Sequence, residues 1–155
     1  MSDYKHYRLE KEPQGPTYIG LLHYALKHCS TALFVRRDSL AVSAEARVII
    51  ARVRPLLVSQ TQERAWPGTE LLSATATVFQ LRFDADTVEQ FSQATDRLFG
   101  WQQPDLPEDL CLLRPDSVPW LVTIAHEGDA YLVLTPTEWA VLIAALPDLA
   151  AYPEQ

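Results

Sequence analysis

The chain has 155 residues, of which 48% are hydrophobic and 21% charged, a balance typical of one folded domain with its own core. Its formal charge of −7 argues against general nucleic-acid binding, which needs excess Lys and Arg to neutralise phosphates. No apolar run approaches the roughly 18 residues of a membrane-spanning helix, and the first residues lack the apolar segment of a signal peptide. We therefore expect a cytoplasmic protein without membrane contact.

The charge is unevenly distributed along the chain. Residues 1–66 carry 10 Lys and Arg against 6 Asp and Glu, whereas residues 67–155 carry 3 against 14. This asymmetry predicts an acidic surface contributed by the second half. Such a surface either attracts a basic partner or simply keeps the protein in solution.

The first half predicts a helix, a strand and a second helix. We expect residues 1–16 to form a flexible polar arm that ends in prolines and a glycine. A first helix is predicted after Thr17, because apolar residues recur at helical spacing as far as Cys29. The Thr17 side chain can cap its start. The segment 31–35 is typical of a short strand.

The middle of the chain predicts another helix and the longest strand. Ser43 opens the helix, and Pro55 should kink or end it because proline removes an amide donor. Residues 66–68 form a turn. Residues 71–83 favour a strand, but the apolar alternation changes phase near Val78, so either both faces are covered or a β-bulge resets the pattern.

The last third predicts a helix over 85–99, capped by Asp84, and a short strand over 110–113. A hairpin over 119–134 follows. If Gly128 and Asp129 form its two-residue turn, several side chains share one core face. They are Trp120, Val122, Ile124, His126, Tyr131 and Val133.

The final helix begins with a capping pattern in which Thr135 precedes Pro136 and Glu138 follows three residues after the cap. Pro147 ends it, and residues 148–155 form a tail. We therefore expect one α+β domain over 17–147, with about four helices and a mixed or antiparallel sheet of about five strands.

The turn of the hairpin holds the best site candidates: His126, Glu127 and Asp129. A histidine near carboxylates can carry protons or bind a metal at neutral pH. The alternative is structural, with His126 at the end of a core face and held by nearby acceptors. The pattern assigns no catalytic residue, metal or cofactor.

A proline-rich loop before the hairpin is rich in carboxylates. Prolines lower the entropy that a loop loses on ordering, so this loop can form a preformed acidic contact surface, with Trp101 as an interface anchor. Alternatively, the tryptophan is a core residue and the carboxylates are solvated. The carboxylates are Asp105, Glu108, Asp109 and Asp116.

Two further patterns leave alternatives open. Arg47 and Arg54 are seven residues apart on the second helix, where they either bind an anion or form a solvated face. Cys29 and Cys111 are the two cysteines, and we expect buried free thiols rather than a disulfide.

Three runs of residues carry a resemblance. They are the segment from Trp101 to Cys111 with its prolines, the Pro119-Trp120-Leu121 triplet, and the segment from Ala125 to Ala130. Together they resemble a group of small uncharacterised bacterial proteins over residues 17–135. In size and acidity the chain is also similar to immunity proteins that neutralise toxins, a likeness that transfers no functional residue.

These observations support two hypotheses and a third possibility. The first is a cytoplasmic bacterial binding protein of immunity or regulatory type that meets a basic protein partner by stoichiometric contact. The second is a small-ligand or metal-binding domain, or an enzyme, that uses the His126 turn. A homo-oligomer joined by a sheet edge is the third.

Overall fold

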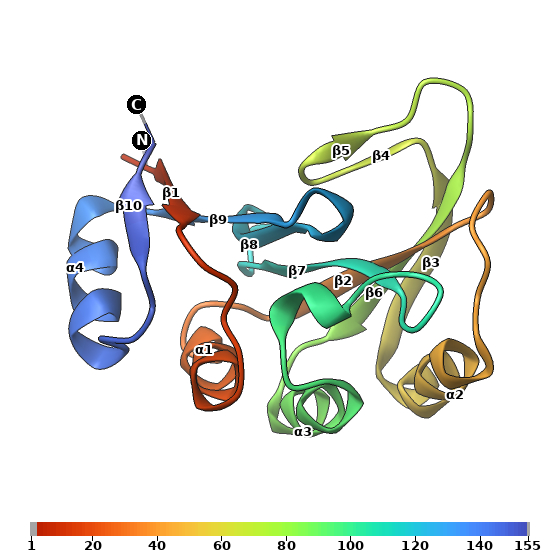
Figure 1. Ribbon diagram of the computed structural model, residues 1–155, viewed down its shortest axis with the longest axis horizontal. Coiled ribbons are helices and arrows are strands. Elements are labelled where there is room, and N and C mark those ends of the chain that lie inside the picture. The colour runs from red at the N-terminus through yellow and green to blue at the C-terminus, as the bar shows by residue number, and fades with distance from the viewer. Residues whose placement is uncertain (1–2, 155) are drawn as a thin grey trace.

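The computed structural model describes residues 3–154 and shows an α+β fold in which one antiparallel sheet carries helices on one face (Figure 1). In this part of the chain the sheet has eight strands in the order β10-β1-β9-β8-β7-β2-β6-β3, with four α-helices. The α+β class is confirmed and the sheet is antiparallel, but the expected number of about five strands was too low.

Two of the strands that the sequence did not predict lie at one end of the sheet. β1 (Lys5–Leu9) pairs with both β9 (Asp129–Leu134) and β10 (Ala151–Pro153). Residues expected in a flexible arm and a tail thus belong to the sheet, because Tyr7 and Leu9 bury alternate side chains there. Residues 1, 2 and 155 of those segments lie outside the described residues.

The helices begin where capping groups allow, with one exception. Ser43 caps α2 (Ala44–Arg52) and Asp84 caps α3 (Ala85–Ala94), as predicted. Thr135 caps α4 (Pro136–Ala145) and forms the predicted capping box with Glu138. The expected Thr17 cap was wrong, because Pro16 occupies the first position of α1 (Pro16–Ala25).

Two core clusters lie on the two faces of the sheet. On the face that carries α1, α2 and α3, here called the helix face, β2 (Thr31–Arg37) contributes Phe34 and β6 (Ala76–Arg82) contributes Phe79. On the opposite face, here called the upper face, the same strands contribute Val35 and Val78. The phase change in β6 therefore reflects burial on both faces, since its pairing with β2 is regular.

A long bent hairpin covers the upper face. α2 ends before Pro55, as predicted, and a short 3-10 turn (Arg54–Leu56) leads into β3 (Leu57–Glu63), an edge strand that the sequence did not predict. Beyond β3 the chain forms β4 (Ala65–Trp66) and β5 (Thr69–Glu70), which fold back over the sheet (Figure 1). We call residues 64–71 the β4–β5 tip.

The tip rests directly on the sheet. Trp66 is buried in the upper cluster. A Cβ atom at Gly68 would lie 2.8 Å from Val122 Cγ1, so the turn needs glycine to approach β8 (Pro119–Ile124) this closely. Its φ of +87° gives a second reason for glycine.

The late hairpin exists, but its predicted register was wrong. Ile124 pairs with Asp129 and Val122 with Tyr131, because Ala125–Glu127 form a 3-10 turn that Gly128 closes in the left-handed conformation. A register shift against β7 (Glu108–Leu113) also places Trp120 on the helix face. The expected common core face therefore does not form, and His126 lies in the turn.

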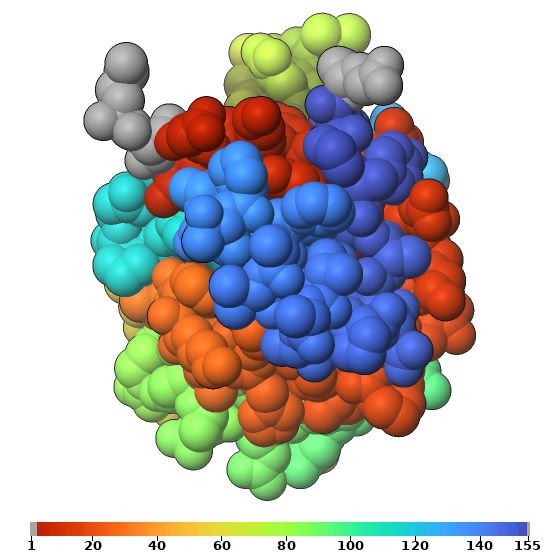
Figure 2. All heavy atoms as spheres, turned by 90° about the vertical axis from the view of Figure 1, so that its left-hand side faces the viewer, coloured from red at the N-terminus to blue at the C-terminus, as the bar shows by residue number. Residues whose placement is uncertain are grey.

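On the side shown in Figure 2, the C-terminal segment lies against the N-terminal one. Trp139 of α4 stacks on Tyr7 of β1 with ring centroids 5.1 Å apart, and Leu146 lies close to Gly20 of α1. Among residues 3–154, no helix has the length and apolar character needed to cross a membrane. Cys29 and Cys111 are buried free thiols, as expected.

Candidate functional site

Arg37 is the last residue of β2, and it continues the alternation of that strand on the upper face. Leu33 and Val35 lie in the upper core cluster, and Arg37 follows two residues later. Its side chain is only 15% exposed. A guanidinium keeps its charge at physiological pH, so its burial requires compensating acceptors.

Two buried carboxylates lie beside this guanidinium. Glu108 and Asp109 begin β7, the strand next to β2, and their side chains are 1% and 0% exposed. Arg37 Nε lies 3.3 Å from Glu108 Oε2, and Arg37 Nη2 lies 3.7 Å from Asp109 Oδ2. Neither contact has hydrogen-bond geometry, so Glu108 Oε2 and Arg37 Nε are buried without a hydrogen-bond partner.

Asp109 joins three parts of the fold. Its Oδ1 accepts a hydrogen bond from the backbone N–H of Ala125 at 2.9 Å, and its Oδ2 accepts one from Trp66 Nε1 at 3.0 Å. The β4–β5 tip, the hairpin turn and β7 are thereby held together. Asp109 itself has a φ of +59°, a left-handed conformation that costs on the order of 1 kcal/mol for a residue with a Cβ.

Gln103 fixes the end of β2 from the other side. Its Oε1 accepts a hydrogen bond from the backbone N–H of Arg37 at 2.7 Å, and its Nε2 donates to the carbonyls of Arg37, Leu40 and Ala41. Its own backbone N–H donates to Glu108 Oε1 at 3.1 Å. Gln103 thus positions the strand that carries the arginine and one oxygen of the carboxylate beside it.

His126 brings the site to the surface. It lies in the hairpin turn with its side chain 38% exposed, so the expected position on a core face was wrong. Its Nδ1 is 3.2 Å from Arg37 Nη2. The neighbouring Glu127 is 61% exposed, with Oε1 3.9 Å from His126 Nε2.

An open hollow of about 290 Å³ lies between the β4–β5 tip and the hairpin turn. Thr69 lines it, and its Oγ1 is buried without a hydrogen-bond partner. We call this space the Arg37 hollow. Its lining residues are Arg37, Gly68, Thr69, Glu70, Leu71, Ile124, His126 and Glu127.

The electrostatics of the site are unbalanced. Burial raises the pKa of Glu108 above its ordinary value, and the charge of Asp109 raises it further, although Arg37 and the N–H of Gln103 act in the opposite direction. A carboxyl group whose pKa stays raised beside an arginine is one whose ionised form the arginine does not fully stabilise. The cluster places two carboxyl groups, Glu108 and Asp109, beside one guanidinium.

A divalent cation would find suitable ligands here. One donor atom each of Glu108, Asp109 and His126 lies within 4.8 Å of the others. Carboxylate oxygens and imidazole nitrogens bind such ions at about 2.0–2.2 Å. The Arg37 guanidinium, however, lies among these three groups, with contacts of 3.2 to 3.7 Å to them. A metal ion could therefore bind only if Arg37 moved away.

The other predicted site residues lie in different environments. Trp101 is fully buried, and its Nε1 donates to the hydroxyl of Tyr18 at 3.0 Å, so it is a core residue. Asp129 pairs with Arg8 of β1 at 3.0 Å. Asp105 is exposed in the loop before β7, and Asp116 is exposed in the turn after it. The predicted acidic surface of four carboxylates is therefore not formed, since Glu108 and Asp109 are buried.

Sequence reasoning missed Arg37, Trp66 and Gln103. A usable signal existed for Arg37, because a charged residue that continues the alternation of Leu33 and Val35 must find buried partners. The glutamate and aspartate at 108 and 109, placed directly before an apolar strand, were candidates for those partners. No comparable signal marks Trp66 or Gln103, because their hydrogen bonds join segments more than 40 residues apart.

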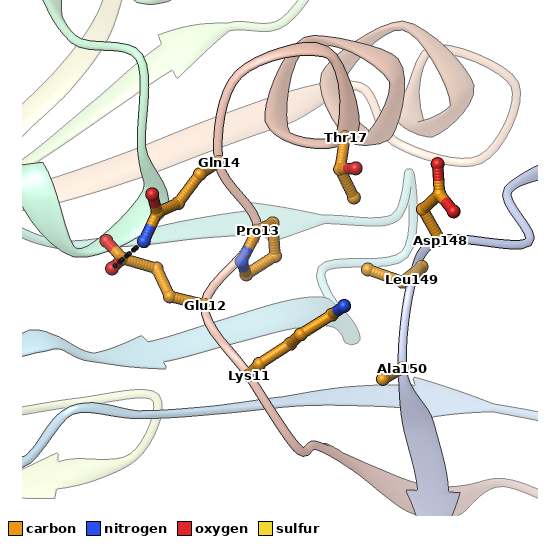
Figure 3. A pocket seen from close by; sticks show the side chains of 8 residues that line it. All are labelled: Lys11, Glu12, Pro13, Gln14, Thr17, Asp148, Leu149 and Ala150. Carbon is orange, nitrogen blue, oxygen red and sulfur yellow. Dashed lines mark hydrogen bonds between the residues drawn. The ribbon is translucent and has the colours of Figure 1, made fainter.

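Another hollow, of about 390 Å³, lies where the link between β1 and α1 meets the link between α4 and β10 (Figure 3). Lys11 and Asp148 both line it, so its charges are mixed. Glu12 accepts hydrogen bonds from Gln14 Nε2, Arg97 Nη1 and the backbone N–H of Phe99. Both oxygens of its carboxylate therefore accept hydrogen bonds within the protein, whereas Glu108 Oε2 accepts none.

Comparison of the chain with models of protein families, with curated proteins and with solved structures found no match. The resemblance to small bacterial proteins stays a prediction. The evidence for a functional site is therefore its geometry alone. The chain is an α+β protein in which an arginine, two buried carboxylates and a histidine lie together near an open hollow.

Proposed function

We propose that the protein is a stoichiometric binding protein of immunity or regulatory type for a partner with a basic surface, and that the Arg37 hollow receives one basic side chain of that partner. The observation that carries this proposal is Glu108 Oε2, a buried carboxylate oxygen without a hydrogen-bond partner that lies 3.3 Å from Arg37 Nε, and Arg37 in turn lines the open hollow. Because the contact with Arg37 lacks hydrogen-bond geometry, this oxygen can still accept a hydrogen bond from a cationic donor.

The charges around the hollow support a cationic ligand. Glu70 and Glu127 line it together with Arg37, and Glu108 and Asp109 lie beside Arg37, so the hollow and the cluster next to it hold four carboxylates and one guanidinium. A hydrogen bond between charged groups in such a partly buried place contributes about 1.5–3 kcal/mol, whereas an exposed ion pair contributes about 1 kcal/mol or less. One buried basic side chain could thus anchor a larger contact.

The wider charge distribution supports the same kind of partner. The second half of the chain contributes 14 of the 20 acidic residues, which would accelerate the approach of a basic protein. Asp105 can add to the contact from the loop before β7 because it is exposed. A cytoplasmic location is part of the proposal, and the two buried free thiols are in keeping with it.

The proposal can be tested without knowing the partner by using acetyl-arginine amide as the probe and acetyl-citrulline amide as its uncharged counterpart. In a titration followed by backbone amide NMR, we expect the arginine probe to shift the signals of residues 68–70 and 126–128, and the shifts to weaken with salt. The citrulline probe should leave these signals in place. Equal shifts with both probes, or shifts elsewhere only, would contradict the proposal.

Matched variants sharpen the test. Replacing Glu70 and Glu127 together by Gln should weaken binding of the arginine probe by about tenfold, equivalent to about 1.4 kcal/mol. Asp116→Asn combined with Glu89→Gln removes two exposed charges that do not line the hollow and should change binding less than twofold. A similar loss in both variants would mean that overall charge, rather than this hollow, attracts the probe.

A divalent cation is the second candidate ligand, and the close approach of three donor groups favours it. If it binds, Arg37→Met should strengthen binding of Zn²⁺ or Mn²⁺ because the competing guanidinium is gone, and His126→Ala in that background should abolish it. Unchanged metal affinity in Arg37→Met, measured by calorimetry, would remove this candidate.

A further inference from the structure

A further hollow at the end of β2 is lined by more arginines than acidic residues, whereas the Arg37 hollow is lined by one arginine and two glutamates. Consecutive residues of a strand point to opposite faces, so Arg36 lies on the helix face while Arg37 lies on the upper face. Arg36 lies 5.6 Å from the ring centroid of Phe79, and its Nη2 donates to Thr77 Oγ1 at 3.3 Å. These contacts hold the guanidinium in a defined place.

A second arginine reaches the same place from α2. Arg47, in the first half of that helix, lines with Arg36 an open hollow of about 300 Å³. We call it the Arg36 hollow. Its other lining residues are Arg37, Asp38, Leu40 and Val42.

The two guanidinia lack acidic partners. Within residues 3–154, neither Arg36 nor Arg47 lies within 4 Å of a carboxylate oxygen in an ion pair. Asp38 is the acidic residue of the lining, and its Oδ2 accepts a hydrogen bond from Thr75 Oγ1 at 2.7 Å. The hollow therefore combines two guanidinia that form no ion pair in the described part of the chain with one carboxylate that is hydrogen-bonded to Thr75.

We infer that the Arg36 hollow binds a small phosphorylated molecule through its phosphate group. Two guanidinia from different elements can each donate hydrogen bonds to oxygens of one tetrahedral dianion, which suits phosphate better than a singly charged carboxylate. Leu40 and Val42 supply apolar surface for the rest of the molecule, and the volume lies at the lower end of the range for small-ligand sites. This inference does not depend on the function proposed for the Arg37 hollow.

The test is a titration of the full chain with inorganic phosphate and with glycerol 3-phosphate at low ionic strength, using glycerol as the uncharged control. We expect saturable shifts of the backbone amide NMR signals of residues 36–47 with both phosphates and none with glycerol. Shifts spread over the surface, or no shifts in this segment, would overturn the inference.

Variants on one helix separate a site from general attraction. Arg47→Gln should weaken phosphate binding about tenfold, because one charge-assisted contact is lost. Arg52→Gln, exposed in the last turn of the same helix, should weaken it less than twofold. Arg36→Gln should act like Arg47→Gln if its folded state is confirmed by the NMR spectrum. Equal losses for Arg47→Gln and Arg52→Gln would overturn the inference.

Discussion

A buried arginine and a partly buried one lie at the two ends of β7, each beside a glutamate, and the two pairs differ in their hydrogen bonds. Arg114, which follows β7, donates from Nη1 to Glu138 Oε2 at 2.9 Å and from Nη2 to Glu138 Oε1 at 3.0 Å. Arg114 Nη2 also donates to the carbonyl of Val133 at 2.8 Å. At the other end, Arg37 and Glu108 approach to 3.3 Å without a hydrogen bond.

The two glutamates respond with opposite pKa shifts. Burial raises the pKa of Glu138, but hydrogen bonds from Arg114 and the Thr135 N–H, with the charges of Arg114 and His28, outweigh it and lower the pKa overall. For Glu108, burial and Asp109 prevail and the pKa is raised. The Arg114 pair is thus a contact of two hydrogen bonds that attaches α4 to the sheet and uses both oxygens of Glu138, although Arg114 Nε has no partner. In the Arg37 pair, Glu108 Oε2 accepts no hydrogen bond.

The largest loss of stability should follow from replacing Asp109, the carboxylate at the Arg37 site that accepts hydrogen bonds from its neighbours. Asp109→Ala leaves the N–H groups of Trp66 and Ala125 without their acceptor and removes one charge facing Arg37. We expect the free energy of unfolding to fall by about 3–5 kcal/mol, measured by urea denaturation. Asp109→Asn, which keeps an acceptor and tolerates positive φ, should cost clearly less; an equal cost would contradict this account.

The next largest loss of stability should separate the two arginine–glutamate pairs. Glu138→Gln should lower the free energy of unfolding by about 2 kcal/mol at neutral pH, since it breaks a two-point charged contact. Glu108→Gln should cost less than about 1 kcal/mol, because the lost charge was poorly compensated. The same urea titration measures both, and a larger cost for Glu108→Gln would reverse the comparison.

The β4–β5 tip completes the Arg37 site, and its glycine allows a smaller test. Gly68→Ala places a Cβ 2.8 Å from Val122 Cγ1 at a φ of +87°, so we expect a loss of about 2 kcal/mol from overpacking and backbone strain. Gly128 is the matched control, with a φ of +63° and no heavy atom within 4 Å. Gly128→Ala should cost about 1 kcal/mol, from backbone strain alone. If both variants lowered the melting temperature equally, the tip would not be packed tightly against β8.

The pH dependence of stability should distinguish the pairs by its sign. Above the ordinary glutamate pKa, unfolded Glu108 loses its proton while folded Glu108 still holds it, so its contribution to stability falls as pH rises through this window. Glu138 behaves oppositely: its contribution is present above the ordinary value and is lost as pH falls through the lowered folded pKa. Relative to wild type, Glu108→Gln should therefore gain stability with rising pH, and the cost of Glu138→Gln should shrink in acid.

The sequence predicted elements where one local signal dominates. The caps at Ser43, Asp84 and Thr135 depend on neighbouring residues only, and all three formed. β3 and β10 escaped prediction because their side chains are mostly exposed and their strand character comes from hydrogen bonds to a neighbouring strand. The hairpin register failed because a four-residue turn replaced the expected two-residue one.

The candidate site was predicted in pieces. His126, Glu108 and Asp109 were each named from their chemistry, but they were assigned to two different surfaces. Their meeting depends on the neighbouring positions of β2, β7 and β8 in the sheet, which no local pattern encodes. Arg37 was missed for the same reason, although its place in the alternation of β2 was visible.

The most direct test of the contrast is the pH titration of the Glu108 and Glu138 side-chain carboxyl groups, followed by ¹³C NMR on the folded protein. We expect Glu108 to titrate above the ordinary glutamate value of 4.5 and Glu138 below it. A pKa for Glu108 below that value would mean that Arg37 fully compensates the carboxylate, and the Arg37 hollow would then have no unmet charge to offer a ligand.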